Sequence, residues 1–199
     1  MTRTRIFYDS EFTGPTSRTT LITIALATEC GAGFYAEFTD YDRDQVDDFV
    51  RDHVLAHSVW LRADTTPGNK SAFHPESQMT TCVGDSSYVT EQLATWLGNR
   101  ESIQIWADHV SYDWVMFCQL FGGALHLPAN IHYIPMDLCT FFECHGYDSD
   151  CNRAEFAADY LDQTRLSALT NDATAQHNAW FDAVQSLACY RRIVAETSL

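Results

Sequence analysis

The sequence predicts an α/β fold with a mixed five-stranded sheet and helices on both faces. Two observations favour it. Three strand-like segments near the N-terminus are separated by short turns, which predicts an antiparallel meander. Two later strand-like segments are each followed by a helix-like pattern, which predicts β-α crossovers. With 199 residues, of which 46% are hydrophobic, the chain is long enough to form one domain with a sizeable core. We therefore expect a single domain over residues 1–199.

The meander is expected at the start of the chain. "RIFYDSEFT" (5–13) alternates apolar and polar residues, as a half-buried strand does. "TTLITIALATEC" (19–30) is typical of a more buried strand. "GAGFYAEFT" (31–39) follows it, with Gly31 and Gly33 where a hairpin turn is needed.

The remaining segments are expected to alternate between helices and strands. Residues 43–57 carry one apolar stripe at helical spacing, formed by Val46, Phe49, Val50 and Val54. Residues 62–85 are polar and contain prolines and glycines, so they predict a long irregular loop. Helices are expected over about 86–98, 111–121 and 178–196, and a further helix is expected to begin near the N-cap Asp137. Strands are expected at 102–108 and 131–135. Residues 146–175 are polar, with weak helical stretches.

Composition limits the classes of function. The formal net charge is -15 and Lys70 is the single lysine. This composition excludes a broad nucleic-acid-binding surface built from lysines, but not the binding of a few nucleotides through metal ions. Solubility or adaptation to salt would also explain the acidity. The most apolar run, Leu21 to Ala27, is too short to span a bilayer, and no signal core precedes the first strand. We expect a cytoplasmic protein without membrane contact.

The cysteines suggest reduced thiols. There are seven, an odd number, without a CxxC pair. Cys139, Cys144, His145 and Cys151 lie close together in sequence, so a zinc site there is a possibility, although their spacing matches no established zinc pattern.

Asp9 and Glu11 are the first candidate metal ligands. They lie two residues apart on the first strand, so both carboxylates point to the same face, together with Phe7. Two neighbouring acids are costly to bury, and a divalent cation removes that cost. Two exposed acids on an edge strand would show the same spacing.

Further candidates follow the fourth strand and open the last helix. Asp108 and Asp113 lie near the end of that strand, and either is a possible ligand or helix N-cap. His177 and Asp182 are five residues apart, whereas two ligands of one metal on a helix are expected four apart. The spacing therefore suggests two roles, a metal ligand at Asp182 and a base at His177, although a histidine at a helix start is also an ordinary surface residue. Oxygen ligands of this kind suit Mg²⁺ or Mn²⁺, and several carboxylates suit two ions.

Taken together, the motifs resemble those of the DEDDh 3′-to-5′ exonucleases, which include oligoribonuclease, RNase T and the proofreading subunit of bacterial replicative polymerase. "DSEFTG" (9–14) resembles the first motif, "HVSYDW" (109–114) the second and "HNAWFDA" (177–183) the third. The resemblance is strongest to a branch of stand-alone bacterial and phage exoribonucleases typified by a mycobacterial enzyme, through "DFVRDHVLAHS", "IWADHVSYDW" and "QLFGGALHLP". His109 departs from it, because many relatives carry asparagine there.

The resemblance implies an RNase H-like fold and a role for each motif residue. Asp9 would bridge two ions, Glu11 and Asp182 would hold the ion that activates water, and Asp113 would support the second ion. His177 would take the proton from the attacking water. The implied substrate contacts are Phe12, Thr13 and Gly14, with Phe12 either stacking on a base or belonging to the core. Arg191 and Arg192 are candidates for phosphate contact or for complementing the helix dipole.

The expected function is therefore that of a divalent-metal-dependent 3′-to-5′ exoribonuclease. It would release nucleoside 5′-monophosphates from single-stranded RNA ends by two-metal hydrolysis with a histidine general base. Three alternatives remain open: the same reaction on single-stranded DNA, a catalytically silent nucleic-acid-binding domain, and an RNase H-type endonuclease. The resemblance also suggests a homodimer.

Overall fold

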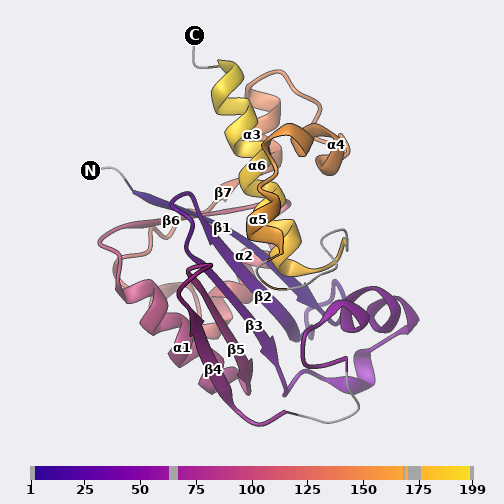
Figure 1. Cartoon of the computed structure of the whole chain (residues 1–199). Coiled ribbons are helices and arrows are strands. Elements are labelled where there is room, and N and C mark those ends of the chain that lie inside the picture. The colour runs from indigo at the N-terminus through magenta and orange to yellow at the C-terminus, as the bar shows by residue number, and fades with distance from the viewer. Residues whose placement is uncertain (1–2, 63–66, 168, 170–175, 198–199) are drawn as a thin grey trace.

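A computed structural model describes residues 3–62, 67–167, 169 and 176–197. Its strands form one mixed sheet in the order β4-β5-β3-β2-β1-β6-β7 (Figure 1). The predicted α/β class, with helices on both faces of a mixed sheet, is confirmed.

The predicted meander and the first crossover strand are present. β1 (Thr4–Phe12), β2 (Leu21–Thr28) and β3 (Gly33–Phe38) pair antiparallel in sequence order. β6 (Ile103–Ala107) pairs parallel with β1, which places the end of β6 beside the acidic residues of β1. β7 (Met136–Asp137) extends the sheet beyond β6.

The predicted strand count of five is wrong, since the described residues form seven strands. Two of these lie in the segment expected to be an irregular loop: β4 (Lys70–His74) and β5 (Met79–Gly84). Burial explains the difference. β5 pairs with β3 and is almost wholly buried, and β4 is the exposed edge strand that pairs with it. The strand expected at 131–135 is reduced to one bridge at Ile131 and the short β7.

Most of the predicted helices are found close to their expected bounds: α1 (Ser86–Gly98), α2 (Val110–Leu120), α3 (Leu138–Cys144) and α6 (Ala179–Thr197). Asp137 caps α3 as expected, because its carboxylate accepts from the Thr140 N–H. The weakly helical region contains α4 (Arg153–Ala157), η5 (Ala158–Tyr160) and α5 (Gln163–Leu166), and the short η4 (Ala124–His126) follows α2.

The helix expected over 43–57 is wrong as a continuous element. The chain instead forms η1 (Arg43–Gln45), the π-helical η2 (Val50–Val54) and η3 (Leu55–His57). The backbone is extended at Val46, which ends η1. Val50 and Val54 are buried as expected, but Phe49 is 52% exposed.

The period of β1 divides the core between the two faces of the sheet. Phe7 packs with α6 residues such as Tyr190 on one face, and Ile6 and Tyr8 pack with α1 and α2 on the other. Figure 1 shows α6 lying over one face of the sheet, while α1 and α2 pack against the opposite face. Within the described residues, no helix is long and apolar enough to cross a membrane.

Candidate active site

The carboxylates of Asp9, Glu11 and Asp182 converge between β1 and α6. One oxygen of each lies within 4.8 Å of the others, although Asp182 is far from β1 in sequence. Asp9 and Glu11 reach this point because they share the face of β1 that α6 covers. The structure thus brings together three of the four carboxylates that the motifs predict as metal ligands.

The start of α6 determines the position of Asp182. Asn178 caps the helix, since its Oδ1 accepts from the backbone N–H of Trp180 at 3.1 Å and of Phe181 at 3.3 Å. Both aromatic residues are buried and anchor the first turn to the core. Trp180 lies so close to Gly33 that a Cβ there would approach the indole to 2.5 Å. This packing fixes α6 above β1.

Asp113 approaches the same strand from α2. It is 7% exposed, and its Oδ1 accepts a hydrogen bond from Ser10 Oγ at 2.5 Å. Ser10 points to the opposite face of β1 from Asp9 and Glu11, so Asp113 is not part of the three-carboxylate group. Its charge nevertheless acts on the other acids, because it raises the pKa of both Asp9 and Glu11.

The four acids repel one another in a partly dehydrated site. Burial raises the pKa of Asp9 and Glu11 well above their usual range, and the charge of Asp182 raises both further. Burial also raises the pKa of Asp113 and of Asp182 to about 7 each. The buried Asp9 Oδ2 has no hydrogen-bond partner among the residues that the structure describes. A site with surplus negative charge and an unpartnered carboxylate oxygen fits a divalent cation, which would supply the missing partner.

His177 lies on the turn before α6, which separates it from the helix as the five-residue spacing suggested. Its backbone is left-handed, with φ 67°, and its N–H donates to Asp182 Oδ2 at 3.0 Å. The imidazole packs edge-on against Phe49, with ring centroids 5.2 Å apart, and lies 6.1 Å from the His53 ring. Burial, together with His53 and His57, lowers the pKa of His177 below 6.5.

The three predicted substrate contacts lie at the end of β1. The Phe12 ring is partly buried, 5.8 Å from the Tyr112 ring. Thr13 is buried, and its hydroxyl donates to Gln45 Oε1 at 2.9 Å and accepts from the Thr20 N–H. Gly14 has open space where a side chain would lie. The side-chain hydroxyl of Thr13 is therefore already occupied within the protein.

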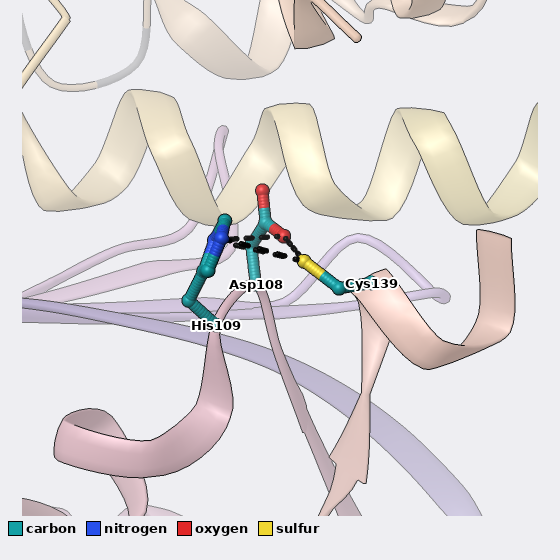
Figure 2. A group of neighbouring side chains, drawn as sticks. All are labelled: Asp108, His109 and Cys139. Atoms are coloured by element: carbon teal, nitrogen blue, oxygen red, sulfur yellow. Dashed lines mark hydrogen bonds and ion pairs between the residues drawn. The ribbon is translucent and has the colours of Figure 1, made fainter. Parts of the chain in front are cut away.

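The other candidates have protein partners. Arg191 donates to the Glu29 carbonyl, and Arg192 pairs with Glu196 at 2.8 Å. Cys139 lies beside Asp108 and His109, and possible ligand atoms of the three lie within 4.8 Å of one another (Figure 2). Cys144, His145 and Cys151, which the sequence groups with Cys139, are not part of this cluster.

Two kinds of residue at the site escaped the sequence reasoning. Ser10 is absent from the motif residues, but its hydroxyl donates to Asp113 Oδ1 and holds that side chain. Phe49 was assigned to an apolar stripe, and the contact of Phe49 and His53 with His177 depends on a tertiary approach of 43–57 to the α6 turn. The segment "DFVRDHVLAHS" contributes to the family resemblance, but its spacing does not indicate a contact with His177.

The fold and site together define an α/β protein with a partly buried group of three carboxylates, the ligand type that hard divalent cations prefer. No family model matches the chain. It is similar to two curated proteins of Mycobacterium tuberculosis, the 3′-5′ exoribonuclease Rv2179c of strain H37Rv and the 3′-5′ exoribonuclease MT2234.1 of strain CDC 1551. Each is 29% identical over 176 residues, which cover 85% of this chain and 96% of the relative. The resemblance to mycobacterial-type stand-alone exoribonucleases that the motifs predict is thereby confirmed.

Proposed function

We propose that the protein is a divalent-metal-dependent 3′-to-5′ exoribonuclease. The observation that carries the proposal is the convergence of Asp9, Glu11 and Asp182 within 4.8 Å, with one oxygen of Asp9 unpartnered within the described part of the chain. The two M. tuberculosis relatives are named for this activity, and the similarity extends over most of both chains. RNA is the preferred substrate in the proposal because of those names.

Asp9, Glu11 and Asp182 would hold Mg²⁺ or Mn²⁺, and Asp113 would support a second ion from the α2 side. Two such ions, when bound, neutralise charge on the phosphodiester and favour attack by water. Asp113 is kept in place by Ser10, and Asp182 by the capped first turn of α6. These residues orient the ligands before substrate arrives, so little reorganisation is needed during the reaction.

His177 would act as the general base. Its lowered pKa keeps the imidazole neutral, and therefore able to accept a proton, near neutral pH. The hydrogen bond from its backbone N–H to Asp182 links the turn that carries the base to a proposed metal ligand. The ring itself rests against Phe49.

The cleavage assay that tests the proposal uses single-stranded RNA labelled at the 5′ end. We expect successive shortening from the 3′ end with release of nucleoside 5′-monophosphates, dependent on Mn²⁺ or Mg²⁺ and abolished by EDTA. A matched DNA oligomer tests the alternative substrate. An RNA blocked at its 3′ end should resist, whereas an endonuclease would cut it. Failure to shorten either strand with either ion would contradict the proposal and favour a silent binding domain.

A further inference from the structure

We propose that Asp108, His109 and Cys139 form a second metal site, which takes a softer divalent ion such as Zn²⁺. One possible ligand atom of each residue lies within 4.8 Å of the other two. Cys139 Sγ is 3.0 Å from Asp108 Oδ1 and 3.6 Å from His109 Nδ1. Figure 2 shows the three side chains pointing toward one another beneath α6.

The donor set differs in kind from the carboxylate group at Asp9. Thiolate and imidazole are ligands that select Zn²⁺ and related ions over Mg²⁺ and Mn²⁺. Three protein donors from side chains leave a fourth tetrahedral position open for water or another exchangeable ligand. The two sites would therefore sort ions by chemistry, with hard ions at the carboxylates and a soft ion at Cys139.

Arg153 holds Asp108 in the way that an outer-sphere partner holds a metal-ligating carboxylate. Its Nε donates to Asp108 Oδ2 at 2.8 Å and its Nη2 to Oδ1 at 3.1 Å. The guanidinium donates to the Ser149 and Cys151 carbonyls, and the Arg153 side chain is 12% exposed. Such partners orient ligands and raise metal affinity. Arg153 Nη2 also lies 3.4 Å from Cys139 Sγ, so its positive charge faces two of the three ligands, and a dication gains the second negative charge only by displacing the thiol proton.

The ligands come from two segments that the fold brings together. Asp108 and His109 follow β6 directly, and Cys139 lies in the first turn of α3. His109 adopts a left-handed backbone with φ 52° and its side chain is 79% exposed, so its ring can turn to meet an ion. A bound ion would tie the start of α2 to the start of α3.

Metal binding would have to displace the thiol proton. Burial and the neighbouring Asp108 raise the pKa of Cys139 to about 11, so the thiol is protonated at neutral pH without a cation. A coordinated cation reverses this preference and releases the proton.

Cobalt provides the decisive probe, because thiolate-bound Co²⁺ shows a sulfur-to-metal charge-transfer absorption that oxygen ligands do not produce. Titration of the full chain with Co²⁺ in excess Mg²⁺ should give this absorption with one equivalent, and Zn²⁺ should remove it. Cys139→Ser should abolish the absorption. Cys144→Ser is the matched control, since it alters an exposed cysteine in the same helix and should leave the absorption unchanged.

His109→Ala keeps every thiol and changes an exposed side chain, so it tests the site even if Cys139→Ser folds poorly. We expect it to weaken Co²⁺ binding at least about tenfold. Absence of the absorption in the wild type, its retention in Cys139→Ser, its loss in Cys144→Ser, or unchanged affinity in His109→Ala would overturn the proposal. Because the readout is specific for sulfur, the result is independent of whether the carboxylate group supports exonuclease activity.

Discussion

Replacing Asp182 by asparagine should stabilise the metal-free protein while removing its response to divalent cations. Asp182 has a pKa of about 7, against 3.8 for the free side chain, because it is buried and lies near other acids. A difference of about 3 pKa units corresponds to about 4 kcal/mol of penalty for the ionised form at pH 8. The neighbouring carboxylates take up protons as well and share this penalty, so we expect Asp182→Asn to gain about 2 kcal/mol.

The substitution is nearly isosteric, and the asparagine oxygen can still accept from the His177 N–H. The assay is thermal and urea unfolding at pH 8, first in EDTA and then with saturating Mn²⁺. In EDTA the gain should appear as a rise in Tm of about 4–8 °C for a chain of this size. With Mn²⁺ at 100 times its Kd, the wild type should gain about 2.7 kcal/mol, and the variant much less.

Asp162→Asn is the matched control. Asp162 caps α5, and its pKa is lowered by the Thr164 hydroxyl, so it is a favourably placed carboxylate outside the acidic site. Asparagine is an equally good cap, so this variant should change neither the stability in EDTA nor the response to Mn²⁺ by much. The reasoning is refuted if Asp182→Asn destabilises the metal-free protein by more than about 1 kcal/mol, or if Mn²⁺ stabilises it as much as the wild type.

Three other predictions follow from the same geometry. His177→Asn introduces a residue that tolerates the left-handed backbone, and it should lower turnover by about two to four orders of magnitude in the RNA assay. The Kd for Mn²⁺, measured by calorimetry, should stay near that of the wild type. Full activity of this variant would exclude His177 as the base. In the folded state the pKa values of Asp113 and Asp182 are raised from 3.8 to about 7, so the free energy of unfolding in EDTA, measured with urea, should fall as the pH rises from about 4 to 8. Mg²⁺ or Mn²⁺ should restore it. A free energy of unfolding that rises over that pH range in EDTA would contradict the electrostatic account. Gly33→Ala should lower the free energy of unfolding by about 1–3 kcal/mol, because its Cβ would clash with Trp180, and an unchanged Tm would show that this packing is looser than described.

The grouping of Asp9, Glu11 and Asp182 in the candidate site was largely predictable from the sequence because their positions obey local periodicities. The spacing of Asp9 and Glu11 on a strand fixes their common face, and the spacing of His177 and Asp182 separates a turn residue from a helix residue. The parallel pairing of β6 with β1 agrees with the predicted order of elements, a meander followed by β-α crossovers. These features depend on neighbours in sequence or on simple topology.

The features that were missed depend on tertiary contacts. The strands β4 and β5 form from a polar segment because β3 offers a free edge, which no local pattern reports. Phe49 belongs to an apolar stripe by spacing, but the helix that would have buried it is broken after η1. Likewise, Cys139 lies beside Asp108 and His109 because β6 and β7 run parallel, so the residues that follow the two strands meet. Its sequence neighbours Cys144 and His145 are not part of this group.

The most direct test of the central claim is a crystal structure of the protein soaked in Mn²⁺, with the ions located by anomalous scattering. The account predicts two manganese ions that share Asp9 as a ligand, with Glu11 and Asp182 completing the protein donors on one of them. Manganese absent from this group, or present only beside Asp108, His109 and Cys139, would contradict it.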